Sequence, residues 1–192
     1  MGITYDSENQ RFVFDFEHDG QADIVNLTGS GYQVEAFGKC FYYGYEFADQ
    51  VDGAVRSAFI KHVKFSEPIQ DNPDLTAFIK KAVDNLSHKI NLYNYDLVVM
   101  PESTSKVNQY MLRYIYRFAQ PTLRKMADVL NYKSNEDICV KVRQHNVLVI
   151  DDETIGGSTL NEILRVLRIL NEDNEIVIFS LLGRKDLMAD AG

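Results

Sequence analysis

The sequence predicts an α/β protein whose core is a doubly wound parallel sheet. From about residue 70 onward, short strands that are apolar on both faces alternate with helices that carry one apolar stripe, which is the pattern of a parallel sheet covered on both sides. The first 50 residues show a different pattern, short runs of alternating or aromatic residues. We therefore expect an N-terminal β-rich hood or subdomain over residues 1 to 66 and an α/β core over residues 67 to 192, packed as one compact unit.

The composition is that of a folded protein with an acidic surface. The chain has 192 residues, of which 45% are hydrophobic and 25% charged, so it can bury a proper core. Its 28 acidic and 20 basic residues give a formal charge of −8. Because proteins bind nucleic acids mainly by neutralising phosphates with basic side chains, this charge excludes a nucleic-acid polymer as a general partner.

The sequence also argues against a membrane or a disulfide framework. No apolar run approaches the roughly 20 residues of a membrane span, and the chain does not open on a cationic stretch followed by an apolar one. We expect a cytoplasmic protein with no membrane partner. Cys40 and Cys139 lack the spacing of a zinc site or a disulfide pair, so both are interpreted as ordinary thiols.

The N-terminal part is expected to form antiparallel β hairpins. Glycine-containing turns separate the runs that have strand character, which are residues 11–17, 22–27 and 32–47. The cluster of Tyr42, Tyr43 and Tyr45 could form a platform for a stacked base, but packing of aromatic side chains within strands is the favoured interpretation. Exposed aromatic residues in this part favour a homodimer.

The core is expected to begin with an amphipathic helix. Asn72 is a suitable N-cap, and Pro73 suits the first helical position because its missing N–H is not needed there. The apolar residues that follow have helical spacing along one stripe: Leu75, Phe78, Ile79, Ala82, Val83, Leu86 and Ile90. A strand of the buried type comes next, Asp96 to Met100.

The second half of the core repeats this alternation. A polar loop leads into a second striped helix from Val107 to Phe118, which Pro121 is expected to stop, with Arg113 and Arg117 on its outer face. The stretch 122–146 is ambiguous, since Leu123 begins a helical spacing while residues 138–142 look like a strand. The remaining elements are an aliphatic strand at 146–150, a helix at 160–170 and an aliphatic strand at 175–182.

One segment after these strands carries the chemistry, VLVIDDETIGGSTL from Val147 to Leu160. Parallel sheets bind ligands beyond the carboxyl ends of their strands, where Asp151 and Asp152 are expected to emerge into solvent. The glycine turn after them can present backbone N–H groups to a phosphate, and the acidic pair suits ribose hydroxyls or a hydrated Mg²⁺. The combination indicates a sugar phosphate, with an acidic helix start capped by Ser158 as the alternative.

This motif resembles the phosphoribosyl-pyrophosphate (PRPP) loop of the type I phosphoribosyltransferase (PRTase) family. The acids Asp151 and Asp152, then Gly157 and Thr159, stand in the matching positions, and the order of core elements extends the resemblance from Tyr95 to Leu182. The resemblance implies a PRTase-like core and three groups of site residues. These are the catalytic Asp151 and Asp152 at the ribose 2′- and 3′-hydroxyls, the 5′-phosphate cradle Ile155, Gly156, Gly157, Ser158 and Thr159, and the pyrophosphate loop Glu102, Ser103, Thr104, Ser105 and Lys106.

The resemblance further implies a Mg²⁺-dependent transferase of nucleotide metabolism. It would move 5-phosphoribosyl from PRPP to a nucleobase or another nitrogenous acceptor and release pyrophosphate. Mg²⁺ would bridge PRPP, with Asp151 and Asp152 acting on it indirectly, through PRPP or water. Arg184, just after the last strand, is a candidate substrate contact, with an ordinary surface cation as the alternative.

Two departures from the family pattern leave other interpretations open. The four positions from Glu153 to Gly156 carry residues unusual for the family, and the loop that closes over the reaction centre has no clear counterpart. A catalytically inactive PRPP- or nucleotide-binding regulatory protein is therefore the second hypothesis. An enzyme that makes PRPP is the third, but it would need an ATP site, and the chain has no GxxxxGK[ST] stretch.

Overall fold

The computed structural model describes twelve stretches of the chain, and the account below refers to these. They are residues 3–6, 8–9, 11–14, 20–23, 26–29, 32–35, 40–46, 73–100, 105–118, 121–125, 146–154 and 175–183.

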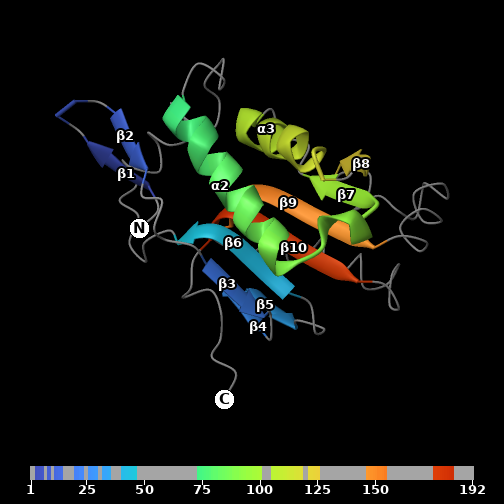
Figure 1. Cartoon of the computed structure of the whole chain (residues 1–192). Helices are drawn as coiled ribbons and strands as arrows, with labels where there is room; N and C mark the ends of the chain where they lie inside the picture. The colour runs from blue at the N-terminus through green and yellow to red at the C-terminus, as the bar shows by residue number, and fades with distance from the viewer. Residues whose placement is uncertain are drawn as a thin grey trace.

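A six-stranded sheet forms the centre of the molecule (Figure 1). Across it the strands lie in the order β3 (Gly20–Asp23), β6 (Cys40–Glu46), β10 (Ile176–Gly183), β9 (Val147–Thr154), β7 (Leu97–Met100) and β8 (Thr122–Lys125). The five strands from β6 to β8 are parallel to one another, and β3 pairs antiparallel with β6 at one edge. The chain is thus an α/β protein with a parallel core sheet, as the apolar strands predicted.

Helices α2 (Pro73–Lys89) and α3 (Lys106–Ile115) contact each other over one face of this sheet (Figure 1). Helix α2 begins at the predicted proline, and it buries the predicted apolar stripe from Leu75 to Leu86, whereas Ile90 lies just past its end and is half-buried. Helix α2 also contacts β6, and α3 contacts β9. A short 3-10 helix, η3 (Leu92–Asn94), connects α2 to β7, and its Leu92 is buried. No helix in the described stretches is both long and apolar enough to span a membrane.

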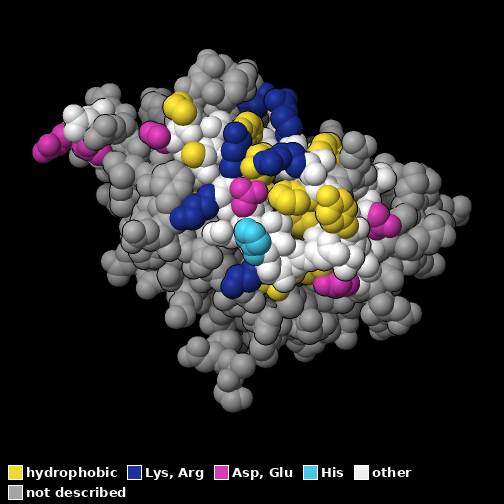
Figure 2. All heavy atoms as spheres, viewed as in Figure 1, with side chains coloured by type: hydrophobic (Ala, Val, Ile, Leu, Met, Phe, Trp, Pro, Cys, Tyr) yellow, Lys and Arg dark blue, Asp and Glu magenta, His cyan; other side chains and the backbone are white. Residues whose placement is uncertain are grey.

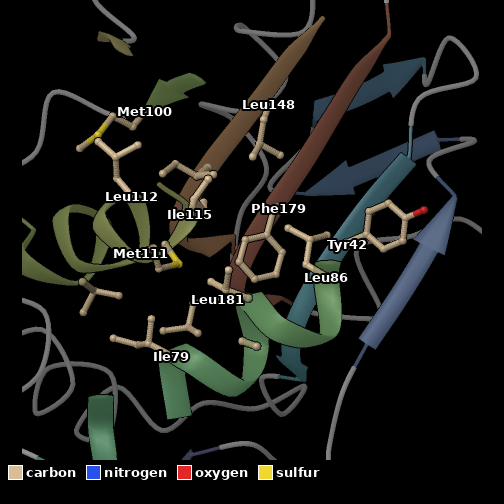
Figure 3. Packing of buried hydrophobic residues seen from close by; sticks show 14 of the residues in the cluster. Tyr42, Ile79, Leu86, Met100, Met111, Leu112, Ile115, Leu148, Phe179 and Leu181 are labelled. Atoms are coloured by element: carbon tan, nitrogen blue, oxygen red, sulfur yellow. The ribbon is translucent and has the colours of Figure 1, made fainter. Parts of the chain in front are cut away.

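The core lies between the sheet and these two helices (Figure 3). Phe179 and Leu181 of β10 and Leu148 of β9 point toward Met111 and Ile115 of α3 and the apolar stripe of α2. The strand residues between them point to the other face because side chains alternate along a strand. They are buried as well, which explains why β9 and β10 both begin with an aliphatic run; Val147, Val149, Ile176 and Ile178 are the residues concerned.

Glycine allows α2 to approach β6 closely. A Cβ atom at Gly44 would lie 2.7 Å from the Cβ of Ala82 in α2 and 3.0 Å from the carbonyl oxygen of Leu181 in β10. Real Cβ atoms essentially never come within 3.0 Å of another heavy atom in this way. The contact between the helix and the sheet at this point therefore requires the absence of a side chain at residue 44.

The outer face of the two helices carries several basic side chains, with hydrophobic side chains beside them (Figure 2). Arg113 and Arg117 are exposed, as predicted. Two cations lie near the ring of Tyr114, with the Arg117 guanidinium carbon 4.3 Å and the Lys80 Nζ 5.8 Å from its centroid. The Tyr114 hydroxyl donates to a carboxylate oxygen of Asp84 in α2 (3.4 Å). These contacts join the exposed sides of α2 and α3.

Two elements of the core differ from their predictions, the end of α3 and the segment from Thr122. Helix α3 stops at Ile115, ahead of the predicted end, and the chain turns through residues 116–118, where the N–H of Phe118 donates to the carbonyl of Ile115 (2.9 Å). The segment from Thr122 is a strand, so its helical spacing was misleading. Backbone pairing with β7 decides its structure, beginning with the bond from the Thr122 N–H to the carbonyl of Asp96 (2.7 Å). Met126, Leu130 and residues 138–142 lie outside the described stretches.

The N-terminal strands fall into separate groups. Strands β1 (Ile3–Asp6) and β2 (Arg11–Phe14) pair antiparallel, and so do β4 (Asn26–Gly29) and β5 (Tyr32–Glu35). The expectation that Cys40–Glu46 belongs to an antiparallel N-terminal part was wrong in one respect, because β6 pairs parallel with β10 in the core sheet. Tyr42 of this strand is buried in the core, which agrees with strand packing rather than base stacking. The division at residue 66 stays a prediction, since residues 47–72 are not described.

The amino ends of the parallel strands are joined by hydrogen bonds around one asparagine. The side chain of Asn146 donates to the carbonyl of Asn94 (3.1 Å) and accepts from the backbone N–H of Glu175 (3.1 Å). The backbone carbonyl of Asn146 accepts from the N–H of Leu97 (3.3 Å), and the hydroxyl of Tyr95 donates to the Glu175 carboxylate. The segments before β7, β9 and β10 are therefore held together at this edge.

Candidate functional site

The strand order places a change of direction between β7 and β9. From β7 the chain goes on to β8 on one side, whereas from β9 it goes on to β10 on the other side. The segments that leave the carboxyl ends of β7 and β9 therefore diverge. In open parallel sheets, ligands bind outside the carboxyl ends of the strands at such a point. The two segments concerned are those that the sequence analysis singled out.

Strand β9 extends beyond its neighbour at this edge. Val99 of β7 is level with Val149 of β9, and β7 ends at Met100. Strand β9 continues to Thr154 and stays paired there with β10, where Ser180 is opposite Asp151 and Gly183 is opposite Thr154. The acidic pair therefore lies in the part of β9 that projects past the end of β7.

The structure corrects the local conformation expected for the two acids. They were expected to emerge from the strand into solvent, but they are part of β9 and continue its ladder with β10. Successive side chains of a strand point to opposite faces, so the structure does not bring the Asp151 and Asp152 carboxylates to one face. Since Leu148 and Ile150 belong to the core beneath α2 and α3, Asp152 lies on that face and Asp151 lies on the other.

Asp152 is a buried acid, with 1% of its surface exposed. It follows Ile150 on the face that α3 covers, at the carboxyl edge of the sheet. A carboxylate in such a place requires compensating polar partners. Within the described stretches, α3 contacts β9, and its N-terminus, which supplies free backbone N–H groups, begins six residues after the end of β7.

Asp151 is half-buried on the opposite face. One of its carboxylate oxygens accepts the backbone N–H of Asp152 (2.8 Å). Ser180 lies directly across from it on β10 and is completely buried. Neighbouring strands are about 4.8 Å apart, so the hydroxyl of Ser180 is close enough to belong to the same polar group on this face.

The first turn of α3 supplies the positive side of the site. Ser105 is the N-cap, and its hydroxyl oxygen accepts the backbone N–H of Asn108 (3.4 Å). The first turn contains no acidic residue, and Lys106 is half-buried there. The partial positive charge of a helix N-terminus favours an anion, and a nearby cation adds to it. Of the predicted pyrophosphate loop, Ser105 and Lys106 are thus placed at this turn.

A polar residue that the sequence analysis did not consider lies beside them. Asn108 is completely buried, and neither its side-chain oxygen nor its side-chain nitrogen has a hydrogen-bond partner within the described stretches. It stands three, four and seven residues before Met111, Leu112 and Ile115, which face the core. An asparagine at a core position of an amphipathic helix was the sequence signal for it, and a serine within the aliphatic strand IVIFSLL was the equivalent signal for Ser180.

Other predicted site residues lie outside the described stretches. They are the pyrophosphate-loop residues Glu102, Ser103 and Thr104, the phosphate cradle Ile155, Gly156, Gly157, Ser158 and Thr159, and the candidate substrate contact Arg184. Within the described stretches, no group of three or more His, Cys, Asp or Glu side chains is arranged to hold a metal ion. The expected Mg²⁺ would be held through PRPP or water, so this finding leaves the Mg²⁺ prediction untested.

Comparison with known proteins adds no family to this description. No protein-family model matches the chain, and no curated protein matches its sequence.

Proposed function

We propose that this protein is a phosphoribosyltransferase of the PRTase type. It would transfer 5-phosphoribosyl from PRPP to a nucleobase or another nitrogenous acceptor and release pyrophosphate. The observation that carries the proposal is the position of the two sequence motifs. The polar loop follows β7, and the acidic motif lies in the last part of the neighbouring parallel strand β9, at the point where the chain changes direction.

The charges at this edge support a ligand with two kinds of groups. Asp152 and the first turn of α3 share one face of the sheet, so a negative and a positive group lie on the same side. The carboxylate disfavours an anionic group placed beside it, and the helix N-terminus and Lys106 disfavour a cationic group placed beside them. PRPP carries hydroxyls that a carboxylate can accept from and phosphates that a helix N-terminus can bind.

The proposed reaction is a substitution at the anomeric carbon of the ribose. The bond to pyrophosphate breaks, the acceptor nitrogen forms the new bond, and negative charge accumulates on the pyrophosphate oxygens. The chain contributes positioning and electrostatic stabilisation. Asp152 would orient the ribose by accepting hydrogen bonds from the ribose hydroxyls, while the first turn of α3 and Lys106 would stabilise the leaving pyrophosphate.

The residues of the site are suited to an indirect role toward Mg²⁺. Carboxylate oxygens are the donors that Mg²⁺ prefers, and this ion usually keeps several waters. Asp151 and Asp152 lie on opposite faces of β9, so a shared chelate by the two is not expected. When bound to PRPP, Mg²⁺ would offset the charge of the pyrophosphate.

A second function is supported by the conformation of β9. The strand continues through Glu153 and Thr154, which are the first two of the four positions that differ from the family pattern. At these positions β9 is paired with β10, which holds its backbone extended. In the family that the motif resembles, the chain would already be leading into a phosphate-binding turn here. This favours a PRPP- or nucleotide-binding regulatory protein without transferase activity as the alternative.

The experiment that separates the two functions is an assay with PRPP, Mg²⁺ and a panel of nucleobases and other nitrogenous acceptors. Release of pyrophosphate that depends on one acceptor would support the transferase. Binding of PRPP in calorimetry without pyrophosphate release on any acceptor would support the regulator. Failure of the chain to bind PRPP would contradict both.

Single substitutions of the two acids test the roles of the opposite faces. We expect Asp152→Asn to weaken PRPP binding by about 10- to 100-fold, because it removes a charged hydrogen-bond acceptor on the face that α3 covers. Asp151→Asn should have a smaller effect. The same change at the exposed Asp96, at the amino edge of the sheet, is the matched control and should leave PRPP affinity unchanged. Equal affinities for all three variants would show that the acidic motif has been misread.

A further inference from the structure

The buried side-chain amide of Asn108, near the start of α3, makes no described contact that would explain a role in stabilising the fold. Both polar atoms of the Asn108 side chain are buried and lack a hydrogen-bond partner within the described stretches. Buried polar side chains in folded proteins nearly always have partners, because leaving one unpaired costs free energy. An exception of this kind calls for a reason, and a bound ligand is one.

The position of Asn108 directs its side chain toward the candidate site. It lies on the core-facing side of α3, one helical turn ahead of Met111 and Leu112. The Cα–Cβ bonds of a helix are tilted toward its N-terminus. The N-terminus of α3 is at the carboxyl edge of the sheet, so the amide of Asn108 leans toward the place where Asp152 projects past β7.

The surroundings of the amide favour an anionic ligand. The first turn of α3 is free of acidic residues and includes the half-buried Lys106, and the helix N-terminus adds partial positive charge. An asparagine side chain offers two N–H donors together with one acceptor oxygen. These donors suit the oxygens of a phosphate group, and they would add a side-chain contact to those made by backbone N–H groups.

We infer that Asn108 is a ligand-binding residue of this site, and that its side-chain amide donates a hydrogen bond to an oxygen of the pyrophosphate group of PRPP. The inference rests on the proposed binding of PRPP and adds a residue to it from α3. It also gives the expected placement of the ligand, with the pyrophosphate at the first turn of α3 and the ribose toward Asp152.

The test is calorimetric titration of the full chain with PRPP and, separately, with inorganic pyrophosphate, both in the presence of Mg²⁺. In Asn108→Leu, a side chain of similar size replaces the amide. We expect its affinity for both ligands to fall by about 10- to 100-fold, the loss of one hydrogen bond to a charged group. Its melting temperature without ligand should equal or exceed that of the wild type, because an unpaired buried amide has been removed.

The matched control is Gln109→Leu, which makes the same kind of change at the adjacent, exposed position of α3. Its affinities should equal those of the wild type. A loss of affinity in Gln109→Leu as large as that in Asn108→Leu would overturn the inference, because the effect would then belong to α3 in general.

The remaining outcomes separate this inference from the proposed function. If the wild type binds PRPP and Asn108→Leu binds it equally well, the inference is wrong and the proposed function stands. If the wild type binds neither ligand, the proposed function is wrong and the inference falls with it. Should Asn108→Leu fail to fold, Asn108→Asp decides. Its carboxylate has nearly the same shape and should repel pyrophosphate, so unchanged affinity would overturn the inference.

Discussion

The two ends of the core sheet use the same type of side chain in opposite ways. At the amino edge, both polar atoms of the Asn146 side chain are hydrogen-bonded, one to Asn94 and one to Glu175. At the carboxyl edge, Asn108 is more deeply buried, and neither of its side-chain polar atoms has a partner within the described stretches. An amide with its partners in place stabilises a fold, whereas a buried amide without them destabilises it.

This difference indicates that the two edges of the sheet have different roles, one in stability and the other in binding. At the amino edge, hydrogen bonds join the segments before β7, β9 and β10, so the alignment of these strands is set there. The carboxyl edge then starts from aligned strands and can carry groups that do not stabilise the fold, such as the buried Asn108. Natural proteins commonly keep such groups where binding requires them.

The largest effect on stability is expected at Gly44, where α2 packs against β6. We expect Gly44→Ala to lower the free energy of unfolding by about 3 kcal/mol, at the upper end for overpacking, because neither obstacle can rotate away. These obstacles are the Cβ of Ala82 and the carbonyl oxygen of Leu181. Urea unfolding measures the change.

A second substitution checks the cause of that effect. Ala82→Gly removes the nearer obstacle, so the double variant Gly44→Ala with Ala82→Gly should recover part of the lost stability, less the cost of about 1 kcal/mol for glycine within a helix. No recovery would show that α2 does not pack against β6 in this way.

The next largest effect is expected at the amino edge. Asn146→Leu removes two side-chain hydrogen bonds and should lower the free energy of unfolding by about 2 kcal/mol. Chemical denaturation of this variant beside Asn108→Leu compares the two edges directly, because the same substitution should destabilise at the amino edge and not at the carboxyl edge. Destabilisation of similar size in both variants would remove the distinction between the edges.

The smallest effect is expected at the cap of α3. Ser105→Ala removes a hydroxyl that accepts the N–H of Asn108 at 3.4 Å, a long hydrogen bond, so the loss should be about 0.5–1 kcal/mol. Thermal unfolding followed by circular dichroism measures it. A loss as large as that of Asn146→Leu would mean that the carboxyl edge is also built for stability, contrary to the comparison.

Much of the core architecture could be predicted from periodicity. The stripe from Leu75 to Leu86 identified α2, and the uninterrupted aliphatic runs identified β9 and β10 as strands buried on both faces. These predictions succeeded because hydrophobic spacing reports directly on which faces of an element are buried. The strand β8 was missed because its burial is incomplete. Leu123 is 36% exposed at the sheet edge, so hydrophobic spacing gave no clear strand pattern there.

The candidate site could be predicted only in part. The acidic motif and the polar loop were visible as polar residues directly after apolar strands. Their relation in space depended on the strand order, and the sequence contains no local signal that β9 lies beside β7. Asn108 and Ser180 were overlooked because each is a single polar residue within an apolar pattern.

The sequence by itself determined the class of fold, the composition of the core and the acidic motif, because these follow from the type and spacing of neighbouring residues. Only the tertiary structure decided that β6 joins the parallel sheet, that β9 projects past β7, and that Asp151 and Asp152 lie on opposite faces. The reason is that strand pairing is made by backbone groups, which every residue except proline carries alike. The choice of partner strands therefore depends on how all the apolar surfaces of the chain are buried together.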